Sequence, residues 1–120
     1  MKSLAPLILI SFFMVGCAGM PTAQEFFPAF AQMTQTKYLT GAEATVRVAN
    51  GSCAVVNNHS IAARIGFTHN DDMVNGARQV DGVLLNDGAN SYRINSYQWV
   101  RANSAGATQL MLNVTALLCD

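Results

Sequence analysis

Apolar and polar residues alternate most strictly between Thr108 and Cys119. The even positions from 110 to 118 are all apolar, whereas the odd positions include Gln109, Asn113 and Thr115. Alternation with a period of two is typical of a strand whose sheet is covered on one face. We therefore predict a strand over this run, with residues 110, 112, 114, 116 and 118 facing the core.

A hairpin is predicted upstream of this strand. Ala44–Ala49 alternates around two valines, and Asn50-Gly51 is a strong signal for a two-residue turn. Cys53–Val56 is then the opposite arm of the hairpin. A second polar turn is expected over Asn57–Ser60, and Ile61–Phe67 is expected to form either a strand or an extended segment.

A helix is predicted next, because apolar residues recur at helical spacing after two acidic residues. Asp71 or Asp72 is a suitable N-cap, and Gly88 stands where a C-cap glycine is common. The predicted apolar face comprises Met73, Ala77, Val80 and Leu84.

Ala89–Val100 is rich in aromatic and β-branched side chains and predicts one more strand before the final one. The order strand, strand, helix, strand, strand indicates the α+β class. We expect a small antiparallel sheet of about four strands (β-β-α-β-β) with one helix packed on one face. This domain is placed at residues 43–120.

The N-terminus has the pattern of a secretory signal peptide. A lysine precedes the apolar run Leu4–Val15, which is short for a membrane span, and small residues follow it. Met14-Val15-Gly16-Cys17 resembles the bacterial lipobox, in which the cysteine becomes the lipid-modified first residue of the mature chain. We expect residues 1–16 to be removed and Cys17 to be lipidated. Cleavage near Ala18 or Ala23 is the alternative.

Residues 17–42 are expected to form a lipidated flexible tether, because small and polar residues and prolines dominate this segment. A patch at Phe26–Met33 breaks the pattern with three phenylalanines and a methionine, and a short helix is expected to begin near Pro28. The patch has three candidate roles: resting in the membrane interface, binding a partner, or packing on its own domain.

Charge and cysteines limit the function classes. Seven basic residues balance seven acidic ones, which gives no electrostatic footprint for nucleic acid. With Cys17 assigned to lipid, Cys53 and Cys119 remain as a pair, and in an oxidising compartment they indicate one disulfide. They lie 66 positions apart, and closing such a loop stabilises a domain by about 4 kcal/mol. Two unpaired buried thiols are the alternative.

The sequence contains no motif that names a reaction. His59 and His69 are the only histidines, and the run His69–Asp72 resembles a helix start more than a metal site. There is no nucleophile elbow, phosphate-binding glycine loop or C-x-x-C. We therefore expect no metal, no cofactor and no enzymatic activity. The glycosylation sequons at Asn58 and Asn113 are expected to be accidental in a bacterial lipoprotein.

Tyr97, Trp99 and Arg101 form a candidate binding surface. They share one face of the predicted strand, and these residue types are enriched at binding surfaces. The alternative is that Tyr97 and Trp99 are core residues under the helix, and the burial of Trp99 distinguishes the two.

Four features carry a family resemblance: a lipid cysteine, a strand with a cysteine at Gly51–Val55, a helix that ends in Gly88-Ala89-Asn90, and a strand that closes on Cys119. In these the chain resembles the small YjeI-like outer-membrane lipoproteins and, more distantly, RcsF-type envelope-stress domains. The resemblance implies an outer-membrane lipoprotein with a disulfide-stapled α+β domain, and it brings no established activity. RcsF-type domains carry four cysteines where this domain has two, which argues against RcsF-like signalling.

The expected function is therefore non-enzymatic. We expect a lipid-anchored outer-membrane protein whose domain, in the periplasm or at the surface, binds or senses an envelope protein or peptidoglycan. Ala18 is not the aspartate that favours inner-membrane retention, which favours the outer membrane. One alternative is an inhibitor of an attacking enzyme such as lysozyme, with Asn57–Ser60 as its protruding loop. Another is a hydrolase, which needs His59 or His69 within reach of a nucleophile.

Overall fold

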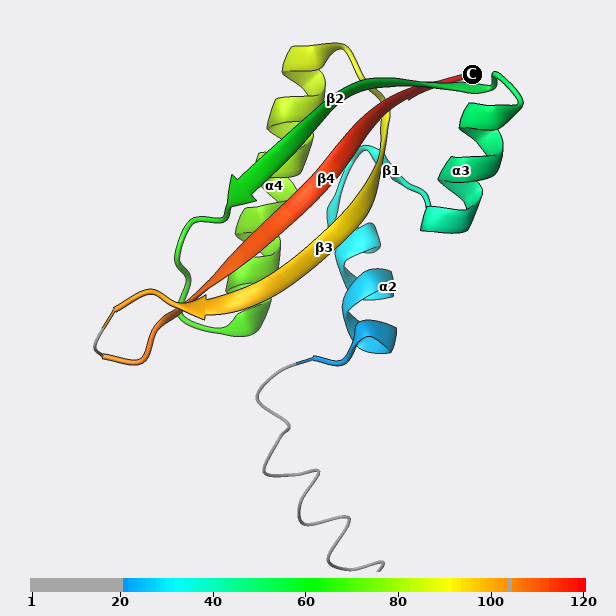
Figure 1. Cartoon of the computed structure of the whole chain (residues 1–120). Helices are drawn as coiled ribbons and strands as arrows, with labels where there is room; N and C mark the ends of the chain where they lie inside the picture. The colour runs from blue at the N-terminus through cyan, green and yellow to red at the C-terminus, as the bar shows by residue number, and fades with distance from the viewer. Residues whose placement is uncertain (1–20, 104) are drawn as a thin grey trace, which may run out of the picture.

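A computed structural model describes residues 21–103 and 105–120, which fold into three helices and four strands (Figure 1). In chain order these elements are α2 (Ala23–Met33), β1 (Lys37–Tyr38), α3 (Gly41–Ala49), β2 (Cys53–Ala62), α4 (His69–Asp87), β3 (Ser91–Arg101) and β4 (Thr108–Cys119). Within the described ranges, none of the helices combines the length and the apolar character that crossing a membrane requires.

The strands form one mixed sheet in the order β1-β3-β4-β2. β4 runs antiparallel to both of its neighbours, whereas β1 pairs with β3 in parallel. α4 connects β2 to β3, and β4 then pairs with both of them from the position between them. The prediction of an α+β domain with a four-stranded sheet is confirmed. In detail, the sheet is mixed rather than antiparallel, because β1 pairs with β3 in parallel. Two helices besides α4 form, α2 and α3, from segments predicted as a tether and as a hairpin arm.

One face of the sheet is covered by α4 and α2, which lie behind the strands in Figure 1. α2 contributes Phe26 and Phe30 to this core, and both are fully buried. Gly76 lets α4 come close to the sheet, since a Cβ there would lie 3.3 Å from the side chains of Leu110 and Leu112. The apolar helix face predicted from the sequence is confirmed, because all four of its members are buried: Met73, Ala77, Val80 and Leu84.

The opposite face is covered by α3 at one end only (Figure 1). A small second core lies there and consists of Leu39, Ala44, Leu117 and the two cysteines. Cys53, the first residue of β2, and Cys119, the last residue of β4, are directly opposite in the sheet and form a disulfide. The predicted disulfide is confirmed, and it closes the end of the sheet beside α3.

The segment expected to be a flexible tether belongs from residue 22 onward to the folded domain. The Glu25 carboxylate accepts hydrogen bonds from the Thr22 N–H at 2.9 Å and from its hydroxyl at 3.1 Å, as in a capping box. α2 therefore begins before Pro28 and contains it, which makes the expected helix start wrong. Burial of Phe26 and Phe30, one turn apart, outweighs the hydrogen bond that the proline removes.

The hairpin predicted around Asn50-Gly51 is also wrong, because residues 41–49 form α3. Thr40 and Glu43 make a second capping box, with Glu43 N–H to Thr40 Oγ1 at 3.1 Å and Thr40 N–H to Glu43 Oε1 at 3.0 Å. The alternating valines do not line a sheet, since Val46 is 60 % exposed on the helix surface. Gly51 still supplies a turn with positive φ, which here leads from α3 into β2.

β2 continues through Asn57–Ser60, where a polar turn was expected. Its register on β4 shifts between Val55 and Asn57, and this bulge interrupts the alternation that marks a strand in sequence. The Ile61–Phe67 segment divides accordingly: residues 61 and 62 end the strand, and the remainder leads into α4.

The ends of α4 agree in part with the prediction. Gly88 is the C-cap, with a φ of 74°. The N-cap is Thr68 rather than Asp71 or Asp72, and its hydroxyl accepts from the Asp71 N–H at 3.0 Å. The two aspartates lie in the first turn instead.

β4 has the predicted bounds but not the predicted faces throughout. Residues 110, 112, 114 and 116 are buried under α4 and α2, as expected. Leu118 is 50 % exposed, because these helices do not reach the end of the strand. Leu117 and Cys119 are buried on the other face, where α3 covers them.

Candidate functional site

A groove lies on the sheet face that α3 only partly covers. Its volume is about 410 Å³, and its walls come from α3 and from strands β2, β3 and β4. This volume falls within the range of small-ligand sites. The lining combines apolar and polar side chains, chiefly Val48, Val55, Leu117, Asn58, Arg93, Asn95 and Thr115.

Side-chain hydrogen bonds cross the floor of the groove through three strands. Asn95 on β3 donates through Nδ2 to Thr115 Oγ1 at 2.9 Å and to Asn113 Oδ1 at 3.0 Å, both on β4. Thr115 donates in turn to Oδ1 of Asn58 on β2 at 2.7 Å. The network uses only one side-chain polar atom each of Asn58 and Asn95. Their other amide atoms, Asn58 Nδ2 and Asn95 Oδ1, remain available to hydrogen-bond a ligand.

Arg93 is the charged residue of the groove. It is directly opposite Thr115 in the sheet, and Thr115 is directly opposite Asn58, so the three form a row across the strands. The guanidinium rests against the start of α3, since a Cβ on Gly41 would lie 3.1 Å from Nη2. Its Nε is buried and has no hydrogen-bond partner, and within the described residues the guanidinium forms no ion pair.

A carboxylate in the first turn of α3, that of Glu43, has another function. Hydrogen bonds from Thr40 hold the pKa of Glu43 below its usual value, with smaller contributions from Lys37 and Arg47. Glu43 therefore caps α3 as an anion. Burial raises the pKa of the neighbouring Tyr38 phenol, Glu43 raises it further, and Arg93 lowers it.

No protein-family model, curated protein or solved structure matches this chain. The resemblance to YjeI-like lipoproteins therefore stays a prediction. The geometry of the domain and the chemistry of its residues are the basis for the function proposed below.

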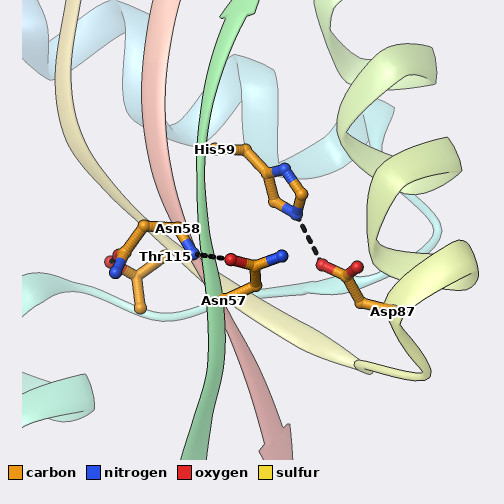
Figure 2. Close-up of polar contacts among 5 residues, drawn as sticks. All are labelled: Asn57, Asn58, His59, Asp87 and Thr115. Carbon is orange, nitrogen blue, oxygen red and sulfur yellow. Dashed lines mark hydrogen bonds and ion pairs between the residues drawn. The ribbon is translucent and has the colours of Figure 1, made fainter.

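The two histidines lie on the other side of the sheet from the groove. Figure 2 shows His59 reaching from β2 toward α4, while Asn58 and Thr115 point the opposite way. His59 Nε2 is 2.5 Å from Oδ2 of Asp87, the last residue of α4. The pair thus fastens the edge strand to the helix. His69 packs its ring against Trp99 at a centroid distance of 5.0 Å.

The predicted surface of Tyr97, Trp99 and Arg101 is largely covered by α2. The Tyr97 ring stacks on Phe26 with centroids 4.0 Å apart, and Trp99 meets the same ring edge-on at 5.7 Å. The Trp99 indole N–H donates to the buried carboxylate of Asp72 at 3.1 Å. Both aromatic residues therefore belong to the margin of the core: Tyr97 lies against α2, and Trp99 contacts both α2 and the first turn of α4. Arg101 is the exposed member.

Other expected sites have mixed outcomes. Cys17 lies outside the described residues. Over residues 21–103 and 105–120, no three histidine, cysteine, aspartate or glutamate side chains gather as metal ligands. Asn57–Ser60 lies within β2, so the inhibitor hypothesis loses its protruding loop.

Sequence reasoning missed the groove, although parts of it were visible. The polar face of β4 was predicted, and it includes Asn113 and Thr115. The two sequons considered accidental contribute Asn58, Asn113 and Thr115 to the same hydrogen-bond network. Their convergence depends on the β2–β4 register, which the sequence did not reveal.

Proposed function

We propose that this protein is a lipid-anchored envelope protein that binds a carboxylate-bearing peptide of the cell envelope, without catalysing a reaction. Peptidoglycan stem peptides are the envelope component of that chemistry, since they carry carboxylates and amides. The outer membrane is the proposed location, with Cys17 as the lipid site. The apolar run at residues 4–15 and the Cys53–Cys119 disulfide support export to an oxidising compartment.

One observation carries the binding proposal: the half-buried guanidinium of Arg93 has no ion-pair partner in the described part of the domain and lines a groove. Burying a charge is costly unless an opposite charge accompanies it. A planar guanidinium suits a carboxylate, to which it donates two parallel hydrogen bonds.

The rest of the groove complements a peptide. Asn58 and Asn95 offer a donor and an acceptor at either side of the Thr115 hydroxyl, which suits the N–H and C=O of a peptide unit. Val48 and Val55 offer apolar contact for a small side chain. A stem-peptide carboxylate on Arg93 would place the adjoining amides over the row of Asn58 and Thr115.

The binding test uses soluble peptidoglycan fragments and the mature protein in isothermal titration calorimetry. We expect Arg93→Gln to weaken binding about tenfold or more, because a charge-assisted hydrogen-bond pair is lost. Arg78→Gln is the matched control, since Arg78 is an exposed arginine on α4 outside this groove. Equal affinities of Arg93→Gln and wild type, or no binding of fragments by wild type, would refute the ligand assignment.

The anchor is tested separately by intact-mass analysis of the protein purified from cell membranes. A mature chain that begins at Cys17 with the added mass of acyl chains supports the lipoprotein assignment. A chain that begins after residue 17, or an unmodified Cys17, contradicts it.

A further inference from the structure

The connection between β2 and α4 presents apolar side chains to solvent. Phe67 is fully exposed and Ile65 is 46 % exposed, although both are large hydrophobic residues. A single exposed hydrophobic residue is ordinary, but here two large ones lie two positions apart on one connection, and grouped exposed apolar side chains mark interaction sites.

Specific hydrogen bonds hold this connection in place. The buried carboxylate of Asp72 accepts from the Gly66 N–H at 2.8 Å, and Asp71 accepts from the Phe67 N–H at 3.3 Å. Gly66 is needed for this approach, because a Cβ there would lie 2.5 Å from the Cβ of Asp71. These hydrogen bonds hold the connection in a turn from which Phe67 projects into solvent.

The same end of the molecule carries the start of the folded chain. Trp99 contacts Phe26 in the first turn of α2 at 5.7 Å and His69 in the first turn of α4 at 5.0 Å between ring centroids. Phe67 precedes His69 by two residues. Figure 1 accordingly shows α2 and α4 both beginning at the lower end of the domain, below the β2–α4 connection.

The length of chain between the proposed anchor and α2 limits how far the start of α2 can lie from the lipid. Five residues, 18–22, separate Cys17 from the first residue of α2. Fully extended, they reach at most about 18 Å. This step rests on the proposed lipidation of Cys17.

We propose that the β2–α4 connection is a second membrane contact, in which Phe67 and Ile65 enter the phospholipid interface beside the acyl anchor. Aromatic and aliphatic side chains are favoured at that depth. Arg64 and Arg101 are exposed near Phe67 and Trp99 and can meet lipid phosphates. The carboxylates of this end are occupied, since Asp71 and Asp72 hold the turn and Glu25 caps α2.

This contact takes the place of the membrane role that was one of three candidates for the Phe26–Met33 patch. Phe26 and Phe30 of that patch are buried in the core and cannot reach lipid. With Phe67 toward the bilayer, the sheet leads away from it, and the Cys53–Cys119 end with α3 and the groove is farthest from the membrane.

The test is indole quenching in reconstituted vesicles. Full-length Phe67→Trp and a matched control, Val46→Trp, are purified with their lipid and inserted into vesicles of phosphatidylethanolamine and phosphatidylglycerol with brominated or plain acyl chains. Val46 is exposed on α3, at the other end of the sheet. The contribution of Trp99 is removed by subtracting the wild-type signal.

We expect the introduced indole to be quenched and blue-shifted in the Phe67→Trp protein and neither in Val46→Trp. The membrane contact would be overturned if brominated acyl chains quenched the indole at position 67 no more than the indole at position 46. Vesicle flotation separates this outcome from failure of the anchor, because wild type must float while Cys17→Ser does not. Flotation with no quenching at position 67 rejects the contact and leaves the anchor intact.

Discussion

Phe26 is the residue that most directly tests whether α2 belongs to the domain. Its side chain is fully buried, and four aromatic rings lie around it: those of Phe27, Phe30, Tyr97 and Trp99. Replacing it by alanine removes these contacts and leaves a cavity that the rigid neighbouring rings fill poorly.

The expected loss follows from that environment. Phenylalanine-to-alanine changes in protein cores cost about 3–5 kcal/mol, and a domain of this size has a total stability of about 5–15 kcal/mol. Phe26→Ala should therefore lower the melting temperature by about 12 °C or more, since each kcal/mol shifts it by about 4–8 °C.

The assays are thermal and urea denaturation, both followed by far-ultraviolet circular dichroism with the disulfide intact. Leu85→Ala is the control, because Leu85 is 81 % exposed on α4 and its removal should change the free energy of unfolding by less than about 0.5 kcal/mol. If Phe26→Ala were as stable as this control, α2 would not be docked on the sheet. Residues 17–42 would then be the flexible tether that the sequence pattern predicted.

Two further predictions concern the disulfide and the glutamates that cap α2 and α3. Cys53→Ser together with Cys119→Ser should lower the free energy of unfolding by about 4 kcal/mol, because the bond closes a loop of 66 residues; a loss below about 1 kcal/mol in urea denaturation would contradict this. Hydrogen bonds from Thr22 and Thr40 lower the pKa of Glu25 and Glu43 below the ordinary 4.5. Their contribution to stability is therefore complete above about pH 4.5 and is lost as pH falls through the lower folded-state values. Melting curves of the Glu25→Gln, Glu43→Gln double variant should show a weaker acid dependence than wild type, and an unchanged one would refute the assignment.

Local sequence patterns were sufficient to predict the elements that bury one regular apolar face. β4 has helices over most of one face and a half-polar other face, so its alternation survives in the sequence. α4 has one apolar stripe and a glycine at its C-terminus, and both signals were sufficient.

α3 and α2 were harder because two signals competed in each. The valines of α3 alternate as a strand would, although Thr40 and Glu43 already had capping-box spacing. In α2, Pro28 favoured a helix that begins at the proline, whereas Thr22 and Glu25 had the spacing that caps a helix beginning earlier. In both helices the capping box agrees with the structure, and the buried residues on one face decide the outcome.

The groove depends on information that no single segment contains. Arg93, Thr115 and Asn58 come from three strands, and their alignment requires the β2 bulge next to Val55 and the irregularity next to Ile94. A shift of one residue would turn Asn58 to the other face of the sheet. Registers between strands far apart in sequence are fixed by the assembled sheet, which is why composition and spacing did not reveal this site.

The central position of β4 has a consequence for biogenesis. β2 and β3 have no direct pairing with each other, and each depends on residues 108–119 for its ladder. A nascent chain that ends before residue 108 therefore keeps only the two-residue pairing of β1 with β3, and its apolar segments lack the sheet that buries them. Any premature stop in that stretch should yield a chain that proteases clear, rather than a shortened domain.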